Sequence, residues 1–405
     1  MKKRYILYDL SSTQASGNSY FHGGGEYAKT IFFKICEYLN EDVSVDVFYY
    51  PNKKIEESII ELCKKNNITV HYCNNHTDIS NLLSEKKYDV FYSALPYSYY
   101  DLIIPPETKF VYNIFGLRAL EYPADKYSLK YSKGDPKGIL KHYLFLFFYS
   151  IAKELKANIN INNLNKLFNI SLKKTIITIS NHSKFSIAYF FPCLSVSEIK
   201  VFYAPLKKYD FDLQENNDIL NYLSVESGKY ILLILGNRSE KGAYRACRAL
   251  NNLVKYHSGF PKYIKIIILG VTYKKHYMKL IKNNQRFIFH DYVSTRDLEI
   301  LYKNAHVFLF PTLNEGFGYP PLEAMKYGTL CACSANSSLT EIYGDSVIYF
   351  NPFDEIEMAN RILQCFDKNI RNEMAIKMSE RFQYISKKQE NDLDLLINEI
   401  IEDKE

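Results

Sequence analysis

The chain has 405 residues, of which 47% are hydrophobic and 24% are charged, and its formal net charge is +6. This length exceeds what one hydrophobic core usually supports, so we expect two domains of an ordinary globular protein. No apolar run reaches the roughly 18 residues that a membrane-spanning helix needs, and the first apolar segment is too short for a signal peptide, so we expect a cytoplasmic protein.

Short apolar segments rich in β-branched and aromatic residues alternate with longer amphipathic segments along the whole chain. Such segments, bounded by turn residues, are typical of parallel strands that helices cover on both faces. Two successive sets predict an α/β fold of two doubly wound, Rossmann-like domains that face each other across a cleft. In chain order the predicted strands are RYILYDL, VDVFYY, ITVHYC, DVFYSAL, KFVYNIF, TIITIS and IKVFYAP, then YILLILG, IKIIILG, FIFHDY, HVFLFP, TLCACS and VIYF.

A polar stretch separates the two sets of predicted strands. We therefore expect an N-terminal domain at residues 1–206, a linker region at 207–228 and a C-terminal domain at 229–371. The remaining residues, 372–405, have a helical pattern, and we expect this tail to pack back toward the N-terminal domain.

Positive charge is concentrated in the first half of the chain. Residues 1–205 hold 25 Lys and Arg against 19 Asp and Glu, and residues 126–184 alone hold 11 against 2. The latter region also contains a predicted aromatic-rich helix at 138–156. Two interpretations are open: a core helix with a solvated basic edge, or a surface that rests on anionic lipid, to which each lysine contributes about 1 kcal/mol. A nucleic-acid groove is disfavoured because no nucleic-acid-binding signature accompanies the charge.

The eight cysteines are scattered, mostly in apolar segments. We expect buried free thiols rather than disulfides or metal ligands. Cys331 and Cys333 are spaced C-x-C in a predicted strand, which directs both side chains to one face of a sheet.

Open α/β sheets bind ligands at the carboxyl ends of their strands, and three notable segments follow predicted strands. In the first, residues 22–35, three glycines open an amphipathic helix. Glycines there let backbone N–H groups approach a phosphate or a sugar, and a helix N-terminus adds positive potential. Gly24 and Gly25 are therefore candidate donor-binding residues, the alternative being a plain strand-to-helix connection.

The second segment, residues 235–250, places Arg238 and Lys241 where a helix begins. Two cations at that end are unfavourable for the helix dipole, so the fold alone does not require them. A bound diphosphate would explain both, since Arg offers a planar fork of donors and Lys a compact charge. Arg245 and Arg248, further along, are expected on the solvated face of the helix.

The third segment, NEGFGYPPLEAM at residues 314–325, contains Glu315 and Glu323, separated by glycines and a Pro-Pro pair. No cluster of His, Asp or Cys accompanies them, so we expect no metal ion here. Glu323 is expected in the first turn of a helix, where a carboxylate suits the dipole, which leaves Glu315 without a structural reason. Carboxylates accept hydrogen bonds from vicinal diols, so the pair can hold two sugars.

With these residues in view, residues 289–354 resemble the C-terminal domain of the family 4 retaining glycosyltransferases, of the bacterial surface-polysaccharide type, which have the GT-B fold. The resemblance rests on the Glu-x7-Glu pattern with GFG, on FHDYV before it and on SANSSLTEIYGDSVIYFNP after it. NRSEKG resembles the family's diphosphate clamp, and NIFGLRALEYPADKY and TISNHSK resemble stretches of its N-terminal domain.

The resemblance implies roles for the candidate residues. Glu323 would bind the ribose hydroxyls of the nucleotide, and Glu315 would contact the donor sugar near the reacting centre. Arg238 and Lys241 would grip the diphosphate. Val293 would lie near the base. Backbone N–H groups for sugar hydroxyls and phosphate would come from Gly316, Phe317, Gly318 and Tyr319.

The implied activity is that of a retaining hexosyltransferase that needs neither metal nor cofactor. It would move a sugar from a nucleotide-diphosphate donor to a glycan or lipid-linked glycan acceptor in lipopolysaccharide or capsule synthesis. The protein would be cytoplasmic, peripheral on the membrane through residues 126–184, and would bind no nucleic acid. Relatives often carry a His where this chain has Phe115, and that His helps to hold the donor sugar. A sugar-nucleotide epimerase of the same fold and a non-catalytic nucleotide-sugar-binding subunit of a polysaccharide assembly complex are the alternatives.

Overall fold

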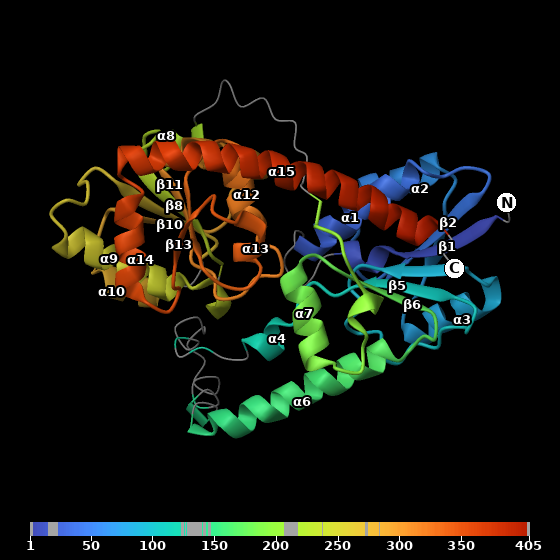
Figure 1. Cartoon of the computed structure of the whole chain (residues 1–405). Coiled ribbons are helices and arrows are strands. Elements are labelled where there is room, and N and C mark those ends of the chain that lie inside the picture. Colours follow the sequence, from blue (N-terminus) through green and yellow to red (C-terminus); the bar gives the residue numbers. More distant parts are fainter. Residues whose placement is uncertain are drawn as a thin grey trace. The chain divides into compact units, whose positions relative to one another are not determined.

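The computed structural model divides into two compact units, each an α/β unit with one parallel sheet (Figure 1). The N-terminal unit comprises Met1–Leu117, Ala157–Lys207 and Ser386–Glu405, and the C-terminal unit comprises Arg118–Lys156 and Lys208–Ile385. Each unit is therefore built from separate stretches of chain. The structure describes residues 3–14, 23–122, 125, 127, 140, 143–144, 147–205, 218–236, 238–271, 274–282 and 284–402.

The N-terminal sheet has seven parallel strands in the order β3-β2-β1-β4-β5-β6-β7. The order reverses between β1 and β4, so the chain leaves these two strands in opposite directions along the sheet. Ligands in doubly wound folds bind at such a switch point. The strands are β1 (Arg4–Asp9), β2 (Val43–Tyr49), β3 (Thr69–Tyr72), β4 (Val90–Ser93), β5 (Lys109–Asn113), β6 (Lys174–Thr178) and β7 (Ile199–Val201).

The C-terminal sheet has six parallel strands in the order β10-β9-β8-β11-β12-β13, with its switch point between β8 and β11. Every one of the thirteen segments predicted as a strand is a strand, which confirms the predicted fold class. The strands are β8 (Tyr230–Ile234), β9 (Lys265–Leu269), β10 (Phe287–His290), β11 (Val307–Phe310), β12 (Cys331–Ser334) and β13 (Ile348–Phe350).

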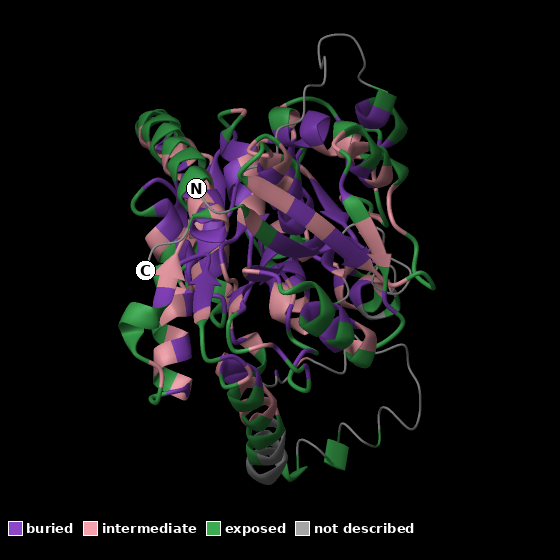
Figure 2. Ribbon diagram, turned by 90° about the vertical axis from the view of Figure 1, so that its right-hand side faces the viewer, coloured by how far each residue is buried: buried purple, intermediate pink, exposed green. Residues whose placement is uncertain are grey.

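Helices connect the strands and cover the sheets, and buried positions concentrate along the strands (Figure 2). In α1 (Gly23–Cys36), for example, buried residues recur at three- and four-residue spacing, at Ala28, Ile31, Phe32 and Ile35, so this face packs inward. The helices are α1 (Gly23–Cys36), α2 (Glu57–Lys65), α3 (His76–Lys86), α4 (Arg118–Glu121), α6 (Tyr149–Phe168), α7 (Asn181–Phe190), α8 (Asp218–Tyr222), α9 (Ala243–Tyr256), α10 (Lys275–Ile281), α11 (Thr295–Asn304), α12 (Tyr319–Met325), α13 (Leu339–Tyr343), α14 (Glu355–Gln364) and α15 (Lys368–Ile401).

The last helix, α15, is a single helix of 34 residues whose final part belongs to the N-terminal unit. There Glu399 is buried and accepts hydrogen bonds from Lys109 Nζ and Thr175 Oγ1, both at 2.8 Å, and from Lys200 Nζ. Burial alone would raise the pKa of Glu399, but these donors outweigh it and lower the pKa to about 2. Asp392, also buried, accepts the backbone N–H of Tyr203 at 2.7 Å. The end of the chain is thus an integral part of the N-terminal unit.

The predictions for the cysteines and for membrane spans can be compared with the described residues. All eight cysteines are free, and six are buried, while Cys36 is partly exposed and Cys193 exposed. Among the described residues there is neither a cluster of three or more metal-ligating side chains nor a helix long and apolar enough to cross a membrane. The predicted helix at 138–156 falls partly outside the described residues, and α6 overlaps its second half.

Candidate donor-binding site

The site begins where β8 ends. Arg238 precedes a 3-10 turn, Ser239–Lys241, and Gly242 then leads into α9. Gly242 has φ +68°, and a Cβ there would lie 2.0 Å from the carbonyl oxygen of Pro311. A glycine is therefore required both by the left-handed backbone and by the close approach of the loop that follows β11.

Direct hydrogen bonds fasten the β8–α9 loop to the β11–α12 loop. The backbone N–H of Leu313 donates to the carbonyl oxygen of Glu240 at 2.6 Å, and Thr312 Oγ1 lies 3.1 Å from the same oxygen. Because β8 and β11 are neighbours in the sheet, both loops leave the same edge at the switch point. The side chains that they carry are consequently held face to face.

Lys241 and Glu315, one from each loop, form an ion pair. Lys241 Nζ lies 2.5 Å from Glu315 Oε1, and Thr312 Oγ1 donates to the same carboxylate oxygen at 2.9 Å. Burial by itself would raise the pKa of Glu315, but the charge and hydrogen bond of Lys241, with smaller contributions from Arg118 and Thr312, lower it below its usual value. Glu315 is therefore an ionised, largely buried carboxylate at neutral pH.

The backbone around Glu315 is anchored to the segment that leads into α13. The N–H of Glu315 donates to Ser337 Oγ at 3.0 Å, and Ser338 Oγ donates to the Glu315 carbonyl at 2.9 Å. The hydroxyl of Tyr343 donates to the carbonyl of Gly318 and accepts the N–H of Leu322. This support fixes the turn at residues 316–319, in which Phe317 and Gly318 are buried.

Glu323 lies in the second turn of α12 rather than in the first, which corrects the prediction from the sequence. The helix begins early, at Tyr319, because Gly318 caps it with φ +90° and the following prolines need no helical N–H partner. Glu323 Oε2 accepts the hydroxyl of buried Tyr302 at 2.9 Å. Burial first, and the nearby Glu323 second, hold the pKa of Tyr302 well above its usual value, so Tyr302 remains a donor.

The remaining predicted residues occupy other loops. Val293 lies, partly exposed, between β10 and α11 in the C-terminal unit. Gly24 and Gly25 lie in the first turn of α1 in the N-terminal unit, where a Cβ on Gly24 would come 2.8 Å from the flexible end of Leu95. Phe115, after β5 in the same unit, packs edge-on against Tyr27 with ring centroids 4.9 Å apart.

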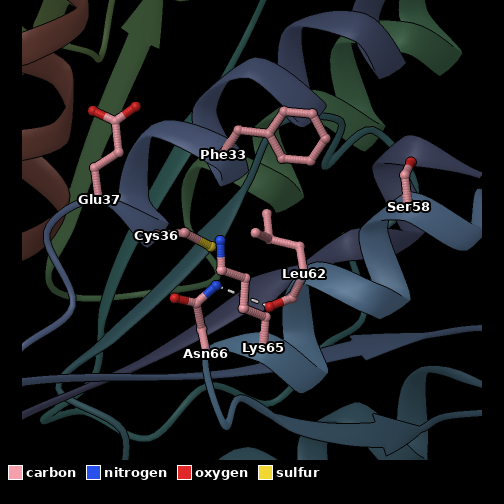
Figure 3. A pocket seen from close by; sticks show the side chains of 7 residues that line it. All are labelled: Phe33, Cys36, Glu37, Ser58, Leu62, Lys65 and Asn66. Carbon is pink, nitrogen blue, oxygen red and sulfur yellow. Dashed lines mark hydrogen bonds between the residues drawn. The ribbon is translucent and has the colours of Figure 1, made fainter.

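The groove drawn in Figure 3 contains none of the predicted site residues. It lies between α1 and α2 in the N-terminal unit, has a volume of about 400 Å³, and is lined by side chains that include Phe33, Cys36, Leu62 and Lys65. It is distinct from the loops at the switch point between β8 and β11.

Comparison with known proteins finds a family match in the second half of the chain. Residues 217–389, less than half of the chain, match the family model described as glycosyl transferases group 1. The match confirms the resemblance inferred from the sequence, and it covers both loops of the Lys241–Glu315 pair.

One relative and two solved structures illustrate the similarity. The O-antigen chain mannosyltransferase B of Escherichia coli is 39% identical over 84 residues, which are 21% of this chain and 22% of that protein. A glycosyltransferase from Rickettsia africae has a TM-score of 0.62 with 14% identity over 100% of both chains. Anabaena Alr3699/HepE, solved with UDP and glucose, has a TM-score of 0.60 with 14% identity over 98% of both chains. The sequence match thus spans about a fifth of the curated relative, and the structural matches establish the GT-B fold.

Two residues of the site were not predicted. Arg118, the first residue of α4, donates from Nη1 to Glu240 Oε1 at 2.9 Å, and Glu240 Oε1 also lies 3.5 Å from Arg238 Nε. Arg118 lies in a stretch that resembled the N-terminal domain, yet it belongs to the C-terminal unit. Since 122 residues separate it from Glu240, no local pattern pointed to the contact.

The prediction that Arg245 lies on a solvated helix face is wrong. Its side chain is only 3% exposed and forms a two-pronged ion pair with Asp125. Asp125 and Tyr127 pack against Arg245 on this face of α9, so the Arg245 side chain makes internal contacts rather than facing solvent. Arg248, on the same face, pairs with Glu355 at 2.6 Å and remains 43% exposed.

Proposed function

We propose that this protein is a retaining glycosyltransferase that moves a hexose from a nucleotide-diphosphate donor to an acceptor hydroxyl during surface-polysaccharide synthesis. The observation that carries the proposal is the Lys241–Glu315 pair, held at the switch point of a sheet in the region that matches the glycosyl transferases group 1 model. The E. coli relative is an O-antigen mannosyltransferase, and the Anabaena structure was solved with UDP and glucose, which supports a nucleotide-sugar donor and a polysaccharide product.

In the proposed reaction the bond between the anomeric carbon and the phosphate oxygen breaks, and the acceptor oxygen bonds to that carbon on the same face. The leaving phosphate takes the acceptor proton, so the products are the new glycoside and a nucleoside diphosphate. Negative charge develops on the leaving diphosphate, and Arg238 and Lys241 stabilise it. Preorganised donors of this kind contribute about 3 kcal/mol, roughly a hundredfold in rate.

Glu315 contacts the donor sugar in this proposal. Because its pKa is lowered, it is available as an acceptor for sugar hydroxyls, and its negative charge favours the oxocarbenium-like transition state. Lys241, which contacts that carboxylate, also contacts the diphosphate in this proposal. The backbone N–H groups of residues 316–319 supply further donors.

The nucleoside occupies the neighbouring part of the same edge. We assign the ribose hydroxyls to Glu323, which Tyr302 orients, and the base to the loop of Val293. Gly24 and Gly25 let the backbone of the N-terminal unit approach the donor. The acceptor is a glycan or lipid-linked glycan, and the basic region at residues 126–184 holds the enzyme at an anionic membrane surface.

The test is a panel of nucleotide sugars, including UDP-glucose and GDP-mannose, with release of nucleoside diphosphate as the readout and Glu315→Gln assayed beside the wild type. Release from one donor that is lost in the variant supports the proposal and names the donor. Interconversion of the donor sugar without release indicates an epimerase. Tight binding of a donor with neither reaction indicates a binding subunit.

A further inference from the structure

A third cation borders the cluster that holds the proposed diphosphate clamp. The guanidinium groups of Arg118 and Arg238 both approach the same carboxylate oxygen, Glu240 Oε1, at 2.9 and 3.5 Å. Arg118 is also close enough to contribute to the lowered pKa of Glu315. Its charge is thus felt at the residue assigned to the donor sugar.

Most of the hydrogen-bonding capacity of Arg118 is unused within the described part of the chain. A guanidinium has five N–H donors in a planar fork. Arg118 donates from Nη1 to Glu240, while its Nε is buried without a hydrogen-bond partner among the described residues. The side chain is 39% exposed, so the remaining donors on its Nη atoms, unlike the buried Nε, can reach a ligand.

The guanidinium fork of Arg118 suits an anionic ligand. The cations Arg118, Arg238 and Lys241 pair with only two carboxylates, Glu240 and Glu315. The third carboxylate nearby, Glu121, accepts a hydrogen bond from Asn314 instead. A nucleoside diphosphate carries at least two negative charges, and phosphate oxygens match the guanidinium fork better than a single carboxylate oxygen does.

We propose that Arg118 is a third cation of the donor-diphosphate site. The Glu240 carboxylate forms an ion pair with the Arg118 guanidinium until the donor binds. The inference rests on the proposed function, since it concerns the same donor. It assigns a direct contact with the leaving diphosphate to residues 118–121, which lie far from the C-terminal domain in the sequence.

The competing explanation is that Arg118 only braces α4 against the β8–α9 loop through Glu240. The two explanations predict different behaviour for two variants that break the same contact. If Arg118 is only a brace, Arg118→Gln and Glu240→Gln weaken binding alike. If Arg118 binds the diphosphate, only Arg118→Gln weakens it, because Glu240→Gln removes a competing anion and leaves the cation in place.

The experiment measures binding of UDP, GDP, uridine and guanosine to the full chain by calorimetry. For the diphosphate that the wild type binds, Arg118→Gln is expected to weaken affinity about 10- to 100-fold, with the matching nucleoside unchanged. Glu240→Gln is expected to leave diphosphate affinity equal or tighter. Arg248→Gln, which breaks an ion pair of similar exposure with Glu355, serves as the matched control and should bind like the wild type.

Three results overturn the inference. Equal weakening by Arg118→Gln and Glu240→Gln would show a brace, and unchanged diphosphate affinity in Arg118→Gln would show that the guanidinium makes no contact. Absence of binding of either diphosphate by the wild type would overturn the proposed function and this inference together. Melting temperatures of all variants identify any loss of folding.

Discussion

Arg245 donates two hydrogen bonds to Asp125, from Nη1 at 2.9 Å and from Nη2 at 2.6 Å, across 120 residues of sequence. Both side chains are buried, and the Arg245 guanidinium also lies over the ring of Tyr127 at 4.7 Å. This pair holds Asp125 against α9, which follows the loop that carries Arg238 and Lys241.

Asp125→Asn is expected to lower the free energy of unfolding by about 3 to 5 kcal/mol, because it leaves the buried Arg245 charge without its counter-ion. Urea denaturation followed by circular dichroism measures the change. The double variant Asp125→Leu with Arg245→Met should recover much of the loss, since apolar side chains of similar volume often replace a buried ion pair without a penalty. A loss below about 1 kcal/mol in the single variant would contradict the assigned role of the pair.

Lys241→Met is expected to reduce turnover of the identified donor by about a hundredfold, because it removes a charge that stabilises the leaving diphosphate. Initial rates at saturating donor measure the effect on kcat. The matched control is Lys377→Met, which breaks the 2.8 Å pair with Glu373 on α15. If turnover in Lys241→Met stays within a few-fold of the wild type, Lys241 does not stabilise the leaving diphosphate.

Turnover is expected to continue in excess EDTA, since Arg238 and Lys241 supply the positive charge at the diphosphate in the proposed reaction. The measurement compares initial rates with EDTA and with added Mg²⁺ or Mn²⁺. A rate that vanishes with EDTA and returns with Mg²⁺ would show that a divalent ion takes part.

Glu399 is expected to make stability depend on pH in the acid range. Its pKa falls from 4.5 to about 2 on folding, so the folded state favours the ionised form. The resulting stabilisation is fully present above pH 4.5 and decreases by about 1.4 kcal/mol per pH unit as the pH falls from 4.5 toward 2. Urea midpoints from pH 6 to pH 3 measure this slope. In Glu399→Gln the slope should be shallower, and an unchanged slope would assign the acid sensitivity to other groups.

Reversing the charge of four lysines in the basic region is expected to abolish sedimentation with anionic vesicles. The four, Lys130, Lys133, Lys137 and Lys141, lie outside the described residues. Each contributes about 1 kcal/mol near an anionic surface, so replacing all four by Glu removes the attraction. Sedimentation with vesicles of phosphatidylglycerol, with phosphatidylcholine vesicles as the control, measures it. Equal sedimentation of wild type and variant would refute binding through this region.

The strands were predictable because their signal is local. VFLF and CACS are short, continuous apolar runs, and such runs are typical of parallel strands that are buried on both faces. The Lys241–Glu315 contact follows from the same logic, since each residue comes just after a strand and the two strands are neighbours. The Arg118–Glu240 contact and the burial of Arg245 were not predictable, because both depend on partners that lie more than a hundred residues away in the sequence. The position of Glu323 was missed by one turn because Gly318 starts the helix earlier than the prolines suggested.

Because Arg118–Lys156 belongs with the C-terminal unit and Ser386–Glu405 with the N-terminal unit, neither unit is one uninterrupted piece of the gene. If two related genes were recombined between the segments that encode the two sheets, Asp125 and Arg245 would therefore come from different parents. The same holds for Glu399 and Lys109. An exchange of domains between relatives therefore succeeds only if the exchanged parts carry compatible partners for the Asp125–Arg245 pair and for the Glu399–Lys109 pair. Because each half needs a partner from the other, the two halves are inherited together. New sugar specificities in such a chain therefore arise more readily by local substitution than by exchange of whole halves.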